Sequence, residues 1–116
     1  MKKGNVYYNN IYCGTLVQTD EEYIFTYDDN YLSLADAKPI SLLMPLNNKE
    51  YRSNILFSFF DGLIPEGYLL ELAIRKWNLD YKDRMDILLK TASDPIGAVS
   101  IVEVQKWFVS AAEKKL

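Results

Sequence analysis

The chain has 116 residues, of which 49% are apolar and 14% aromatic, and we expect one domain that buries roughly two-thirds of its unfolded surface. The formal net charge of −3 argues against direct nucleic-acid binding, because that affinity comes from clustered Lys and Arg side chains. The single Cys13 excludes an intrachain disulfide, and since no run approaches the ~18 apolar residues of a membrane span, we expect a cytoplasmic protein.

The first third of the chain has the pattern of antiparallel strands. Residues 6–8 and 11–13 are aromatic and β-branched, and Asn9 and Asn10 between them tolerate the positive φ of a two-residue hairpin turn. Gly14 predicts a bulge or a close approach of two backbones. A third strand is predicted over Tyr23–Tyr27 and should end at residues 28–30.

Two prolines frame a predicted fourth strand. Pro39 should open an extended segment over residues 40–43, and Pro45 should close it by restricting Met44 to extended geometry. Residues 47–52 are predicted to form a polar loop. A last strand is expected over Val99–Val104.

Three helices are predicted in the second half of the chain. Ser53 should cap a short helix that runs through Phe60 and stops at Gly62. A second helix is expected over residues 65–78. Asp80 should cap the third, which ends at the Asp-Pro pair of residues 94–95 and whose apolar side carries Tyr81, Met85, Leu88 and Ala92.

The second predicted helix is amphipathic. Its apolar face holds Trp77, which is predicted to anchor the core, together with Leu70, Ala73 and Ile74. Glu71 and Arg75 form an i,i+4 pair on another face, and Tyr68 aligns with them. Tyr68 should therefore point to solvent, where it either packs sideways with a wet hydroxyl or acts as an interface anchor.

The most informative segment joins the first two helices. Residues 59–67 read Phe-Phe-Asp-Gly-Leu-Ile-Pro-Glu-Gly, which indicates a helix end and a new helix start. Pro65 suits a first helical turn, and Glu66 should place a carboxylate against the positive helix end. Pro65, Glu66 and Gly67 either belong to a partner-binding surface or have a purely structural role, in which they shape the corner and Gly67 allows close backbone packing.

This segment resembles the signature of the HipA N-terminal subdomain, which belongs to serine/threonine-kinase toxins of bacterial toxin–antitoxin systems. Three further segments resemble the same family in the same order: the first hairpin over residues 6–16, the Ser-Leu-Leu-Met-Pro-Leu run of residues 41–46 and the Asp-Pro-Ile-Gly-Ala-Val run of residues 94–99. The resemblance covers residues 6–102.

The element pattern and the resemblance together predict an α+β fold. We expect a single domain with a curved, mainly antiparallel sheet of about five strands, packed with about three helices. Residues 1–104 are predicted to form this domain. Residues 105–116 form a C-terminal tail that either packs its aromatic side chains on the domain or docks on a partner.

The sequence carries little that predicts catalysis. The chain has no His, and the nucleotide loop, the catalytic Asp and the metal-holding Asp or Asn motif of a kinase have no counterpart in it. The acid pairs of Asp28 with Asp29 and of Asp83 with Asp86 are typical of turns and helix surfaces, and Cys13 is predicted to be a small buried hydrophobe. We therefore expect no enzyme activity, cofactor or metal.

The resemblance implies a binding function. In split HipBST-type systems this subdomain is a separate small protein, HipS, which binds the HipA/HipT-like kinase and restrains it, while a HipB-like protein binds the operator. The chain is similar to that subunit. Two alternatives remain open: an assembly module that bridges the kinase and a HipB-like repressor without inhibition, or an N-terminal fragment of a full-length HipA kinase. The candidate partner-binding residues are Phe60, Asp61, Leu63, Ile64, Pro65, Glu66, Gly67, Tyr68, Glu71 and Arg75.

Overall fold

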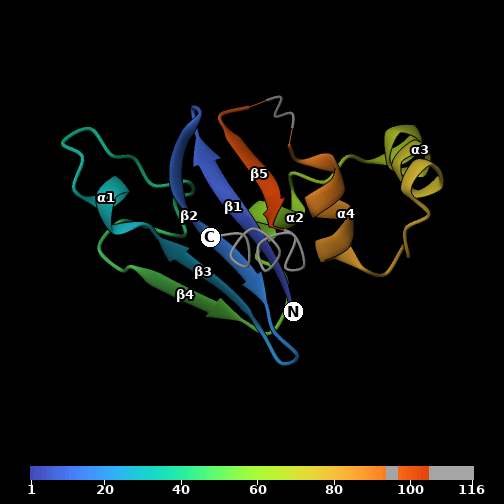
Figure 1. The fold of residues 1–116 in the computed structure, drawn as a ribbon, viewed down its shortest axis with the longest axis horizontal. Coiled ribbons are helices and arrows are strands. Elements are labelled where there is room, and N and C mark those ends of the chain that lie inside the picture. The colour runs from blue at the N-terminus through green and yellow to red at the C-terminus, as the bar shows by residue number, and fades with distance from the viewer. Residues whose placement is uncertain (94–96, 105–116) are drawn as a thin grey trace, which may run out of the picture.

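The structure, a computed structural model, describes residues 1–93 and 97–104, and its centre is an antiparallel sheet (Figure 1). The five strands lie in the order β4-β3-β2-β1-β5, and every neighbouring pair is antiparallel. The predicted α+β fold with a five-stranded sheet is confirmed. The strands are β1 (Lys2–Tyr8), β2 (Ile11–Gln18), β3 (Tyr23–Tyr27), β4 (Glu50–Ser53) and β5 (Val99–Val104).

The hairpin of β1 and β2 follows the prediction. Asn9 and Asn10 have φ values of 48° and 68°, which match the twist of a tight hairpin turn. The register between the two strands shifts after Val6, which leaves an extra residue before Gly14 on β2. A Cβ on Gly14 would lie 2.3 Å from the carbonyl oxygen of Thr26, so the predicted close backbone approach is also confirmed.

The predicted fourth strand over residues 40–43 is wrong. The Ile40 N–H donates to the hydroxyl oxygen of Tyr27 at 3.1 Å, and the Met44 N–H donates to the Ser41 carbonyl at 3.0 Å, so this segment forms turns. The fourth strand is β4, which lies largely in the segment predicted as a polar loop. Polar side chains such as Glu50 and Arg52 suit an edge strand, because charges discourage pairing with other chains.

The structure describes four helices within residues 1–93. The helix α1 (Asp29–Leu32) was not predicted, and it forms because the Asp28 carboxylate accepts a hydrogen bond from the Tyr31 N–H at 3.2 Å. The other helices are α2 (Ser58–Asp61), α3 (Gly67–Trp77) and α4 (Arg84–Thr91).

The predicted starts of α2 and α4 need correction. Ser53 belongs to β4, and its hydroxyl accepts from the Ile55 N–H at 3.3 Å, so it does not cap α2. Asp80 accepts from the Lys82 N–H in a turn, and the cap of α4 is Asp83, whose carboxylate accepts from the Asp86 N–H at 3.0 Å. Tyr81 precedes α4 and is exposed. The predicted end of this helix at residues 94–95 lies outside the described residues.

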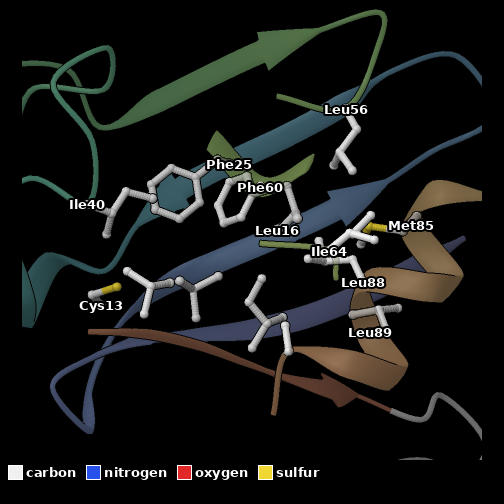
Figure 2. Packing of buried hydrophobic residues seen from close by; sticks show 14 of the residues in the cluster. Cys13, Leu16, Phe25, Ile40, Leu56, Phe60, Ile64, Met85, Leu88 and Leu89 are labelled. Atoms are coloured by element: carbon white, nitrogen blue, oxygen red, sulfur yellow. The ribbon is translucent and has the colours of Figure 1, made fainter. Parts of the chain in front are cut away.

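One face of the sheet carries the core. Phe25 of β3 packs against Phe60 of α2, with ring centroids 5.6 Å apart, and Leu16 of β2 faces the same layer (Figure 2). The helix α4 contributes Met85, Leu88 and Leu89, which close the other end of the core (Figure 2). These apolar side chains are almost fully removed from water, and they fix α2 and α4 on the sheet.

Candidate interaction surface

The chain passes from α2 to α3 through a short segment of defined geometry. The Leu63 N–H donates to the Phe60 carbonyl at 3.0 Å, and the Ile64 N–H donates to the Asp61 carbonyl at 3.1 Å. Two tight turns therefore follow α2 directly, and an extended stretch then leads into α3. We call residues 61–68 the α2–α3 corner.

Gly67 sets the start of α3. Its φ is +58°, a left-handed conformation that a right-handed helix interior excludes, so α3 begins here and not at Pro65 as predicted. Nothing lies within 4 Å of the place of a Cβ on Gly67, so the predicted close packing is wrong. Glu66 is the N-cap residue of α3, but its side chain makes no capping hydrogen bond.

An ion pair holds the α2–α3 corner on α4. The Arg84 Nε atom lies 2.8 Å from the Asp61 Oδ1 atom. This hydrogen bond raises the pKa of the Arg84 guanidinium, which stays charged in any case. Below the ion pair, the buried side chain of Ile64 faces Leu88 of α4, so polar and apolar contacts both fix the corner (Figure 2).

The helix α3 presents most of its surface to solvent. Leu70 and Ala73 are its only buried residues, and Ile74 is half-buried against the core. The helix packs mainly on α4 and stands at the edge of the molecule, beyond α4 from the sheet (Figure 1). Tyr68 is 72% exposed in its first turn, which confirms the predicted exposure of this side chain.

Trp77 is not the predicted core anchor. Its side chain is 40% exposed, and the ammonium of Lys76 lies 4.7 Å from the centroid of its ring. The helix ends directly after Trp77, because Asn78 has a φ of 51° and the Leu79 N–H donates back to the Ile74 carbonyl. The aromatic ring therefore lies at the rim of the domain.

A hollow of about 420 Å³ separates the exposed sides of α3 and α4, and we call it the α3–α4 hollow. Of its lining residues, Pro65 alone was predicted to bind a partner, and Ala73 and Trp77 were predicted to face the core. Leu69 and Leu72 lie off the predicted apolar face, and this second set of apolar positions on one short helix was the signal that could have revealed it. The lining residues are Pro65, Leu69, Leu72, Ala73, Lys76, Trp77, Lys90, Thr91 and Ser93.

The predicted partner-binding residues fall into two groups. Phe60 and Ile64 are buried in the core, so they support the corner from below and do not present a surface. The remaining candidates are half-buried or exposed, so a partner can contact their side chains, or the backbone in the case of Gly67. These are Asp61, Leu63, Pro65, Glu66, Gly67, Tyr68, Glu71 and Arg75.

The other chemical candidates have structural explanations. Cys13 is fully buried, and burial together with the charge of Asp28 raises the pKa of its thiol to about 12. A thiol in that state is a poor nucleophile. No group of His, Cys, Asp and Glu residues within the described ranges 1–93 and 97–104 could hold a metal ion. None of the helices described there is long and apolar enough to cross a membrane.

The helix α1 and the turn between β1 and β2 lie across the molecule from α3 (Figure 1), and a second exposed apolar surface is found there. Ile11 and Tyr12 of the hairpin and Leu34 after α1 leave part of their side chains exposed around a hollow of about 310 Å³. Asp28, Asn30 and the buried Tyr31 also line it. We call this surface the hairpin-end hollow.

The fold and these surfaces define a small α+β domain with an open antiparallel sheet and an exposed helical corner. The family model described as the HipA N-terminal domain matches residues 4–102. The chain therefore belongs to the HipA N-terminal domain family.

The chain is also similar to two individual proteins. A protein of Haemophilus influenzae, described as an uncharacterized protein, is 28% identical over 103 residues, which cover 89% of this chain and 93% of that protein. A solved structure described as the N-terminal domain of HipA toxin matches with a TM-score of 0.69 and 24% identity, covering 91% of this chain and 95% of that chain. At this identity the solved structure supports the fold.

Proposed function

We propose that this chain binds a HipA-type serine/threonine kinase and restrains it, as a HipS-like antitoxin subunit of a split toxin–antitoxin system. Membership in the HipA N-terminal domain family supports the toxin–antitoxin context. The sequence itself has no His and no kinase motif. A domain of this composition inhibits by occupying a surface of its partner, not by chemistry.

The observation that carries the proposal is the exposure of Tyr68. The turns after α2, the left-handed Gly67 and the Asp61–Arg84 ion pair present this side chain at the edge of the molecule. Tyr is enriched at binding hot spots because its ring buries a large area at low entropic cost. Tyr68 enters the kinase cleft, and the neighbouring α2–α3 corner rests on the rim of that cleft.

A kinase assay tests this proposal. Under this proposal a HipA-like kinase is encoded beside this chain. That kinase is titrated with the wild-type chain, with Tyr68→Ala and with Tyr81→Ala, and binding is followed in parallel. Tyr81 is a matched control because it is also an exposed tyrosine, at 64%, but lies outside the corner. We expect wild type and Tyr81→Ala to suppress activity, whereas Tyr68→Ala binds and leaves residual activity at saturation. Equal suppression by Tyr68→Ala would contradict the role of the corner.

A second candidate function is an assembly module that bridges the kinase and a HipB-like repressor without inhibition. The hairpin-end hollow favours it, because α1, which lies next to this hollow, and α3, which follows the α2–α3 corner, are at opposite ends of the molecule (Figure 1). The two surfaces can therefore hold two partners at once. Under this function, the wild-type chain binds the kinase with no loss of activity. A Leu34→Asp substitution in the hairpin-end hollow should then release the repressor while the kinase stays bound.

A further inference from the structure

The α3–α4 hollow has the composition of a protein-binding pocket. Leu69 and Leu72 are 61% and 42% exposed, and Trp77 lies beside them at the end of the helix. Three large apolar side chains on adjacent turns leave an apolar area in water that a partner would remove. The hollow shares only Pro65 with the α2–α3 corner, so its residues can be changed without touching Tyr68.

The charge of the hollow selects the kind of partner. Among the described residues that line it, Lys76 and Lys90 carry a charge and none is acidic. The Lys90 ammonium lies 2.7 Å from a carboxylate oxygen of Glu103, which neutralises it. Lys76 makes no ion pair within residues 1–93 and 97–104, and its ammonium contacts the ring of Trp77 instead. Within the described part of the chain, the positive charge of Lys76 therefore stands beside the apolar hollow without an acidic partner.

We infer that the α3–α4 hollow binds a segment of the partner kinase that carries an apolar side chain next to a carboxylate. The apolar side chain enters between Leu69, Leu72 and Trp77, and the carboxylate pairs with Lys76 at the rim. Removing this ion pair from bulk water on binding strengthens it. This inference rests on the proposed function, because the kinase is the partner that it names.

The two surfaces then have different roles. The α3–α4 hollow supplies affinity, since it combines apolar area with a charge that steers a partner of opposite sign. The α2–α3 corner supplies inhibition through Tyr68. Affinity and inhibition should therefore respond to different substitutions, which makes the inference separable from the proposed function.

Binding measurements with the full chain and the neighbouring kinase test the inference. We expect Lys76→Glu and Leu72→Asp each to raise the Kd about tenfold or more. Lys76→Glu places a negative charge where a carboxylate docks, and Leu72→Asp places one where an apolar side chain enters. Lys82→Glu is the matched control: it makes the same charge change at an exposed residue that does not line the hollow, and its Kd should stay within about twofold of wild type. Unchanged binding by both hollow variants overturns the inference.

The same titrations distinguish the two proposals. At saturating concentration, Lys76→Glu should suppress the kinase as fully as wild type, whereas Tyr68→Ala should not. Weaker binding of the hollow variants without any inhibition by wild type would contradict the proposed function and support the inference. If wild type does not bind the kinase at all, both are overturned.

Fluorine NMR tests directly whether the kinase covers the side chain of Trp77. Trp77 and Trp107 are the two tryptophans of the chain, so Trp107→Phe leaves Trp77 as the single reporter in a chain labelled with 5-fluorotryptophan. Its fluorine chemical shift differs between H₂O and D₂O while the ring is exposed. We expect this solvent effect to shrink in the complex with the unlabelled kinase. An unchanged solvent effect in a saturated complex contradicts the inference.

Discussion

The neighbouring helices α3 and α4 use their apolar residues in opposite ways. Four of the eight residues of α4 are buried, and they join the core on the sheet. Only two of the eleven residues of α3 are buried, although the helix also carries four large hydrophobic side chains that are exposed to water. We infer that α4 mainly stabilises the fold, whereas α3 mainly provides an exposed surface.

A matched pair of leucine substitutions tests this difference and has the largest expected effect. Leu88 of α4 is fully buried, so Leu88→Ala should lower the free energy of unfolding by about 2–5 kcal/mol through lost contacts and a residual cavity. Leu72→Ala in α3 should cost less than about 1 kcal/mol, because its side chain is already partly in water. Urea denaturation measures both. Similar losses at the two positions would contradict the division between the helices.

The backbone at Gly67 gives the next largest effect. Gly67→Ala should lower the free energy of unfolding by about 1–2 kcal/mol, because alanine is strained at a φ of +58°. Conformational strain is the sole cause, since no atom lies close enough to clash with the added Cβ. Asn tolerates this conformation better, so Gly67→Asn should recover part of the loss. Thermal unfolding of the two variants measures the difference. If Ala and Asn destabilise equally, the left-handed conformation is not the cause.

The strands that depend on local sequence patterns were predicted correctly, and the errors lie where the structure depends on long-range contacts. The hairpin, β3 and β5 follow from alternating apolar residues and turn chemistry, which are local signals. β4 was missed because an edge strand needs few apolar residues, and residues 40–43 were misread because their backbone bonds to the Tyr27 hydroxyl, 13 residues away in sequence. Such long-range hydrogen bonds leave no local pattern.

The candidate site was predicted only in part, because some of it also depends on contacts between distant segments. Exposure of Tyr68 follows from helical periodicity, but periodicity does not say where a helix lies relative to the core. Trp77 shares a face with Leu70, yet it lies two turns further along α3, where the helix has passed the edge of the core and ends at Asn78. The hollow beside it depends on the placement of α4, which no pattern within α3 encodes.

The ion pair between Lys2 and Asp83, at the start of α4, should have the smallest effect on stability. Burial acts to raise the pKa of the Asp83 carboxyl, but hydrogen bonds from the Lys2 ammonium and the Asp86 N–H outweigh it, and the pKa in the folded state is lowered. The carboxylate therefore stabilises the fold above its unfolded pKa, and this contribution is lost as the pH falls through the lower folded pKa. The side chains of Lys2 and Asp83 are both about one-third exposed. We therefore expect their ion pair to contribute less than about 1 kcal/mol to the free energy of unfolding.

The variant Asp83→Asn isolates this charge, since Asn also caps helices. The stability of wild type should exceed that of the variant near neutral pH. The difference should shrink as the pH falls below about 4 and vanish below the folded pKa, where the carboxyl group is protonated in both the folded and the unfolded state. Denaturation at pH 7 and at pH 3 measures this. A stability difference that does not change with pH would assign the effect to packing.

The most direct test of the account is hydrogen exchange of the full chain, measured alone and in complex with the neighbouring HipA-like kinase. In the free chain, α3 should exchange faster than α4, because fewer buried contacts hold it. In the complex, we expect the main gain in protection over residues 61–77, which cover the α2–α3 corner and α3. Protection that appears only at the hairpin-end hollow, with α3 unchanged, would contradict the account.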